Sequence, residues 1–190
     1  NYDPSIETNQ IKNLLARGVE GIALFGTSQQ RDALKLLKTR GIPYIHVGSL
    51  SAPLGGYASG FDNREAIKLG VEHLLKNGHK HFGVLTGITN DNDRAKDRVA
   101  GALELLSERK IHLKPELIVE CQYELQEARL GLKKLIQNNP KITAIICGND
   151  VLAMGALLEA QRQGIQIPRD LSIVGFDDLE ISRHLLPSLT

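Results

Sequence analysis

Polar side chains that could bind a ligand follow three apolar runs of the sequence, and a fourth lies on a helix after another such run. Asn149 follows ITAIICG, Asp177 follows LSIVGF, Tyr123 follows LIVECQ, and Arg98 lies on the helix after HFGVLTG. They supply amide and carboxylate groups, a donor that can bind two oxygens at once, and an aromatic ring. This combination suits a small polyhydroxylated or heterocyclic ligand, because a ring can stack on the apolar face of a sugar.

Acidic neighbours of these residues have alternative roles. Asp150 is equally compatible with capping the helix that begins after it, which leaves Asn149 as the better ligand candidate. Asp178 could cap a short turn, which favours Asp177 for ligand contact. Asp62 opens DNRE, which has the spacing of a helix capping box, and a ligand role is its minority alternative.

Arg98 and Tyr123 have structural alternatives as well. Arg98 could be a solvated helix residue, but it is followed by Val99 and Ala100, which favours partial burial with a partner. Tyr123 could equally be cover for the hydrophobic core.

Motifs for catalysis or metal binding are absent from the sequence. It contains no G-x-S-x-G, no phosphate-binding G-x-x-x-x-G-K-[ST] and no G-x-G-x-x-G, so we predict neither an enzyme nor a cofactor. His79 and His81 alternate in GHKH and could share one face of a strand. No cysteine or acidic cluster accompanies them, so we interpret both as residues at the start of a strand and predict no metal site.

The elements that must position these residues alternate between apolar strands and amphipathic helices. Six short apolar runs are separated by segments of helical periodicity, and SLSAPLGGYASG has the composition of a loop. Such alternation is typical of parallel sheets covered by helices on both faces. In open sheets of this kind, ligands bind beyond the carboxyl ends of the strands, where the polar residues described above are expected.

Composition narrows the class of protein. The chain has 190 residues, of which 42% are hydrophobic, and its formal net charge is +1. This balance gives no electrostatic footprint for nucleic acid, so any DNA-binding element would lie outside this stretch.

Cys121 and Cys147 are interpreted as buried small hydrophobic residues in a reducing compartment. No apolar run is long enough for a membrane span. The start without Met and the end at LLPSLT lead us to expect a fragment of a longer protein.

Several motifs occur together in an order that resembles a known family. GVEGIALFGT, GIPYIHVG, LGVEHLLKNGHKHFGVLTG, DRVAGALELL and CGNDVLAMGAL through IPRDLSIVGFDD are similar to the effector-binding core of the lactose-repressor/galactose-repressor (LacI/GalR) transcription factors. The resemblance covers essentially the whole chain. The P-x-L-T near the end favours these repressors over periplasmic sugar-binding proteins of ABC transporters, which share the fold and are the alternative function.

The resemblance implies an α/β fold of the type I periplasmic-binding-protein architecture, with two lobes, each a parallel sheet flanked by helices. Both ends of that fold are expected to be incomplete here. Residues 1–87 are assigned to the N-terminal lobe, whose first strand, helix and strand are missing, and residues 88–176 to the C-terminal lobe. Residues 177–190 are expected to begin a crossover back towards the N-terminal lobe.

The resemblance also implies a function and a set of site residues. Arg98 in RVAG matches the family's effector-binding arginine, while Asn149 in GND and Asp177 in GFDD match pocket positions. Tyr123 aligns with an aromatic residue that often stacks on the ligand, although Ala128 replaces the usual Gly five residues on. Asp62 falls in a DN that resembles the pocket-lip motif. The family implies a cytoplasmic homodimer that binds a sugar-like effector between its lobes and operator DNA through a head domain absent from this chain.

Overall fold

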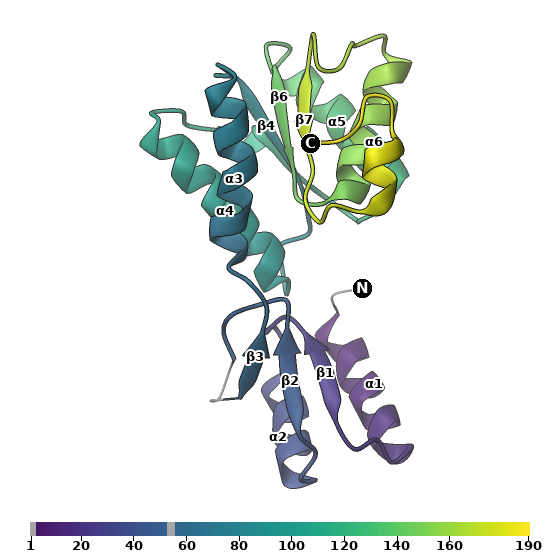
Figure 1. Cartoon of the computed structure of the whole chain (residues 1–190). Helices are drawn as coiled ribbons and strands as arrows, with labels where there is room; N and C mark the ends of the chain where they lie inside the picture. The colour runs from purple at the N-terminus through teal and green to yellow at the C-terminus, as the bar shows by residue number, and fades with distance from the viewer. Residues whose placement is uncertain (1–2, 53–55) are drawn as a thin grey trace. The chain divides into compact units, whose positions relative to one another are not determined.

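The computed structural model describes residues 3–52 and 56–190, which fold into α/β units with parallel sheets (Figure 1). The helices and strands cluster into two compact units. The first comprises residues up to Asn63 together with Thr89–Lys96, and the second comprises Arg64–Ile88 and Asp97–Thr190. The expected class, parallel sheets flanked by helices, is confirmed.

The first unit contains a three-stranded parallel sheet in the order β1-β2-β3. Its strands and helices are α1 (Pro4–Ala16), β1 (Ile22–Phe25), α2 (Arg31–Thr39), β2 (Tyr44–Val47) and β3 (Tyr57–Ser59). Asp3 caps α1, because its Oδ1 accepts hydrogen bonds from the backbone N–H groups of Ser5 at 2.8 Å and Ile6 at 3.3 Å. A small core forms where Leu24 of β1 meets buried residues of the two helices, while neighbouring Phe25 is exposed.

The second unit is built on a four-stranded parallel sheet in the order β5-β4-β6-β7. Its strands are β4 (Phe82–Gly87), β5 (Ile118–Cys121), β6 (Ala144–Cys147) and β7 (Ser172–Val174). Its helices are α3 (Asn63–Lys76), α4 (Asp93–Glu108), α5 (Leu125–Asn138) and α6 (Asp150–Arg162), of which α3 and α4 begin in the first unit.

Helices cover both faces of this second sheet. Figure 1 shows α3 and α4 on one side of the strands and α5 and α6 on the other. Alternate residues of β4 therefore enter different cores: Phe82 and Val84 pack with α3 and α4, and Leu85 packs with α5 and α6. Burial on both faces explains why this strand is apolar along most of its length instead of alternating with polar residues.

Three features differ from the sequence-based expectations. The described residues contain seven strands, because β3 lies within the segment predicted to be a loop. Residues 64–87 belong to the second unit and not to the first, since β4 pairs with β5 and β6, whereas residues 89–96 belong to the first unit and not to the second. Residues 177–190 also fold onto the second unit, where the Gly175 N–H donates to the Thr190 carbonyl at 2.8 Å.

Candidate ligand-binding site

The candidate site lies at the carboxyl ends of β4, β5, β6 and β7 in the second unit. Two of these strand ends carry a glycine whose absent side chain makes room for a polar group. A Cβ at Gly87 would collide with the phenol ring of Tyr123, and a Cβ at Gly175 would collide with the Asp150 carboxylate. The glycines that follow the apolar runs therefore let polar side chains lie directly against the ends of the strands.

Arg98 and Tyr123 meet at this edge. The Arg98 Nη2 lies 3.4 Å from the Tyr123 hydroxyl oxygen, which accepts the hydrogen bond. The guanidinium carbon of Arg98 also lies 4.8 Å from the centre of the Phe176 ring, a cation–π distance. Arg98 is 9% exposed, so the prediction that it is buried with a partner is confirmed.

Asp177 follows Phe176 at the end of the segment after β7. Its φ is 111°, in a region that non-glycine residues rarely adopt, and its side chain is exposed. Desolvation by the surrounding atoms raises the pKa of Asp177, and the negative charge of Asp150 adds to this. The positive charge of Arg98 acts on the same pKa in the opposite direction. The structure therefore brings Arg98, Tyr123 and Asp177 into one neighbourhood.

Asn149 is half-buried and caps α6. Its Oδ1 accepts a hydrogen bond of 2.9 Å from the Leu152 N–H, so the cap is Asn149 and not Asp150, contrary to one of the alternatives raised by the sequence. Among the described residues the Asn149 side-chain nitrogen has no hydrogen-bond partner. The oxygen of this residue therefore has a structural role, while its amide nitrogen remains able to donate to a ligand.

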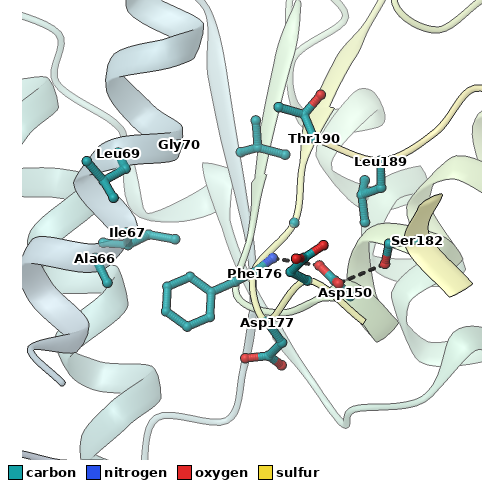
Figure 2. Close-up of a pocket in the computed structure, with 13 residues that line it drawn as sticks. Ala66, Ile67, Leu69, Gly70, Asp150, Phe176, Asp177, Ser182, Leu189 and Thr190 are labelled. Carbon is teal, nitrogen blue, oxygen red and sulfur yellow. Dashed lines mark hydrogen bonds between the residues drawn. The ribbon is translucent and has the colours of Figure 1, made fainter. Parts of the chain in front are cut away.

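Asp150 organises the segment that carries Asp177. It is only 2% exposed and accepts hydrogen bonds from the backbone N–H groups of Phe176 and Leu179, both at 2.8 Å, and from the Ser182 hydroxyl at 2.7 Å. Figure 2 shows this carboxylate between the end of β7 and Ser182. The sequence signal for this role is an acid directly after the capping residue, but its partners lie 26–32 residues further along.

The other two acidic candidates are placed elsewhere. Asp178 does not cap the short 3₁₀ helix Glu180–His184. It forms an exposed ion pair with Arg183, with 2.6 Å between Oδ2 and Nη2. Asp62 is an exposed residue of the first unit, immediately before α3. Phe176, which contacts Arg98, is a further residue of the site that was not predicted; its position directly before two acids is the signal that could have indicated it.

A pocket of about 420 Å³ lies beside the site, within the second unit (Figure 2). One wall is the apolar surface of α3, including Ile67 and Leu69, and the other is formed by residues 174–178, Ser182 and residues 189–190. Asp177 and Phe176 line this pocket, whereas Arg98 and Tyr123 do not. Because Arg98 stacks on Phe176, that ring connects the pocket with the Arg98–Tyr123 pair.

His79 of GHKH contacts two hydroxyl groups. The two ring nitrogens of His79 lie 3.0 Å from the Thr143 and Ser172 hydroxyl oxygens. Across residues 3–52 and 56–190, no group of three potential metal ligands is present. No helix of that same portion is long and apolar enough to cross a membrane.

Sequence comparison identifies related proteins. The family model of the periplasmic binding protein-like domain matches residues 71–190. The ribose operon repressor of Haemophilus influenzae is 36% identical over 74% of this chain and 39% of its own length. The transcriptional repressor PurR of Actinobacillus pleuropneumoniae is 28% identical over 99% of this chain and 56% of its own length. The chain thus spans about half the length of the curated relatives it matches.

Solved structures show the same architecture. The transcription regulator GntR of Chromobacterium violaceum has a TM-score of 0.90 at 26% identity, over 100% of this chain and 69% of that chain. A LacI-family transcriptional regulator of Mycobacterium smegmatis has a TM-score of 0.83 at 27% identity, over 96% of this chain and 67% of that chain. The fold that positions Arg98, Tyr123, Asn149 and Asp177 is therefore one that is found in transcriptional regulators.

Proposed function

The chain belongs to the periplasmic binding protein-like domain family, and on that premise we propose that it is the effector-sensing part of a LacI-type transcriptional regulator. The observation that carries this proposal is the cluster of Arg98, Tyr123 and Asp177 at the carboxyl ends of the parallel strands. The relatives reported above are repressors and regulators, which favours this function over that of a sugar-binding protein of an ABC transporter.

The chemistry of the cluster suits a small sugar-like effector. The Arg98 guanidinium can donate to two ligand oxygens, and its contact with the Phe176 ring orients the guanidinium plane. Asp177 accepts hydrogen bonds from hydroxyl groups, and the Asn149 amide nitrogen donates one. The Tyr123 ring offers an aromatic face. None of these groups is arranged as a nucleophile with an adjacent base, so the proposed role is binding without turnover.

The proposed mechanism is a shift between two conformations of the regulator. An effector shifts that equilibrium only by its difference in affinity for the two states. In the complete protein, a homodimer in the cytoplasm would pass the change to operator DNA through a head domain outside this chain. Coupling is reciprocal, so operator DNA must change effector affinity by the same factor, on the order of 1–3 kcal/mol in free energy. Equal effector affinity with and without operator would refute this mechanism.

A thermal-shift screen against sugars, sugar phosphates and nucleosides tests the site. A ligand that binds only the folded state raises the melting temperature by mass action. We expect Asp177→Asn to abolish that rise. Asp170→Asn is the matched control. It removes the same charge from an exposed ion pair of the second unit that does not line the pocket, so it should leave the rise unchanged.

The result that contradicts the site is an identical response of both variants. A second measurement separates binding from catalysis: the ligand that raises the melting temperature is recovered after incubation and analysed by mass spectrometry. Recovery of a chemically altered ligand would replace the regulator proposal with an enzymatic one.

A further inference from the structure

A second candidate site lies in the same unit at the opposite, amino-terminal edge of the sheet. Two pockets, of about 420 Å³ and 570 Å³, open there. They share Lys80, Ile111 and His112, so they are the two halves of one depression. Volumes of this size lie in the range of small-molecule sites.

The walls of this depression are strongly basic. Its cations are Lys80, Arg109, Lys110, Lys114 and Lys141. Glu116 is the one acidic side chain among the described residues that line it, and its distance to the Lys114 ammonium is 4.0 Å. Within the described part of the chain, Lys80, Arg109, Lys110 and Lys141 form no ion pair. Since the whole chain has a net charge of only +1, the positive charge is concentrated at this edge.

Helix ends explain only part of this charge. Arg109 and Lys110 directly follow the last residue of α4, where a cation is stabilised by the helix dipole. Lys80 lies in the segment between α3 and β4, and Lys114 directly precedes the 3₁₀ helix Pro115–Leu117. Neither position belongs to the last turn of an α-helix, so the helix dipole does not account for their convergence with the other cations.

The depression is held in a fixed shape. Its floor includes Phe82, which is 2% exposed. The Asn138 side chain donates a hydrogen bond of 2.7 Å to the Glu116 carbonyl, and the Asn139 Oδ1 accepts one of 3.0 Å from the Lys141 N–H. The first bond ties the end of α5 to the segment before β5, and the second holds the turn that carries Lys141. The backbone around the depression is therefore ordered before an anion enters, and the entropy cost of binding is mainly that of ordering the exposed lysine and arginine side chains.

We propose that this depression is a second ligand site, separate from the strand ends that carry Arg98, and that it binds a small molecule bearing one or more phosphate groups. Lysine ammonium groups bind phosphate as point charges, and the His81 and His112 rings at the walls can donate further hydrogen bonds. The apolar floor accommodates the non-phosphate part of the ligand. A regulator with this site would respond to a phosphorylated metabolite as well as to its proposed effector.

Titration with inorganic tripolyphosphate at 0.15 M salt, followed by calorimetry and NMR, tests the proposal on the chain as it stands. We expect saturable binding that shifts the amide signals of residues 80–82, 111–114, 139 and 141 and leaves those of Arg98 and Tyr123 unchanged. The double variant Lys80→Gln/Lys141→Gln should weaken binding at least about tenfold, as expected for losing hydrogen bonds to charged groups. The control Lys12→Gln/Lys35→Gln removes the same charge from exposed positions of the first unit and should change affinity less than twofold.

Three outcomes would overturn the proposal: no saturation, equal weakening by both double variants, or amide shifts centred on Arg98. Equal weakening would mean that general electrostatic attraction accounts for the binding. Binding to vesicles of anionic phospholipid is measured in a separate experiment, because a lipid headgroup also presents phosphate. Sedimentation of the protein with vesicles, together with no binding of tripolyphosphate, would reject the small-molecule assignment.

Discussion

The Asp150 carboxylate accepts a hydrogen bond of 2.7 Å from the Ser182 hydroxyl, which joins the first turn of α6 to a residue 32 positions later. The same carboxylate accepts the backbone N–H groups of Phe176 and Leu179. All three donors lie in the segment that begins at the end of β7. Asp150 therefore determines how this segment leaves the sheet, and with it the position of Asp177.

Asp150→Asn is expected to destabilise the protein. The asparagine side chain has nearly the same volume as that of aspartate. Its NH₂ group, however, would face donor groups that then lose their hydrogen-bond acceptor. Each unsatisfied buried group costs about 1–3 kcal/mol, so a loss on the order of 3 kcal/mol in the free energy of unfolding is expected. Urea denaturation followed by circular dichroism measures this loss. Ser182→Ala removes one donor only and should cost about 1 kcal/mol. Equal costs for the two variants would show that Asp150 does not act through three bonds.

Gly87→Ala is expected to weaken effector binding. The added Cβ would displace the Tyr123 ring, whose hydroxyl lies at Arg98. Gly78 is the control position: its φ is 85° and a Cβ there meets nothing within 4 Å. Gly78→Ala should therefore cost stability through backbone strain, on the order of 1–2 kcal/mol, without changing affinity. Calorimetry with the effector found in the thermal-shift screen measures both variants. Unchanged affinity in Gly87→Ala would show that Tyr123 is not part of the ligand site.

Asp177 is expected to make the protein less stable as the pH rises above about 4. Desolvation raises the pKa of this carboxyl above its ordinary value of 3.8, so the folded state holds a proton that the unfolded state has lost. Stability therefore falls as pH increases from 3.8 through the folded pKa and is constant above it. Asp177→Asn should remove this part of the pH dependence.

Unfolding measured between pH 3.5 and 7 provides the test. The stability of Asp177→Asn relative to the parent should increase over that range. Asp178→Asn should show the opposite sign, because the hydrogen bond from Arg183 lowers the pKa of Asp178. The ion pair of Asp178 stabilises the folded state above its unfolded pKa and is lost as the pH falls. Parallel pH profiles for the two variants would contradict these assignments.

The sequence predicted the parts of the fold that depend on local patterns. Apolar runs such as those containing Phe82 and Ile145 became strands, and Asp3 before Pro4 became the cap of a helix. β3 was missed because its three residues lie among glycines and serines and join the sheet only through pairing with β2. The membership of residues 64–88 in the second unit depends on the pairing of β4 with β5 and β6, which no local pattern reports.

The candidate site was predictable to a similar degree. The rule that ligand residues follow parallel strands selected Arg98, Tyr123 and Asp177, which lie near one another in the second unit. Local sequence could not assign the cap of α6 between Asn149 and Asp150, because both are good capping residues. Asn149 accepts its hydrogen bond from Leu152 within α6, whereas the partners of Asp150 come from the segment after β7, so the distinction needed three-dimensional structure.

The two cysteines are expected to resist modification in the folded protein. Burial raises the pKa of the Cys121 thiol to about 11, and the charge of Glu127 contributes to a smaller extent. Burial raises the pKa of Cys147 further still, and that residue is 0% exposed. The thiolate is the reactive form, so at pH 8 the thiolate fraction of Cys121 is roughly a hundredfold below that of a free cysteine.

Reaction of the thiols with an aromatic disulfide reagent should therefore be slow for the parent protein. It should be slower still for Cys121→Ser, because the remaining Cys147 becomes exposed only when the α5–α6 side of the core opens. Urea should make both thiols reactive. Rapid labelling of Cys121→Ser without denaturant would show that this core opens more readily than its packing implies.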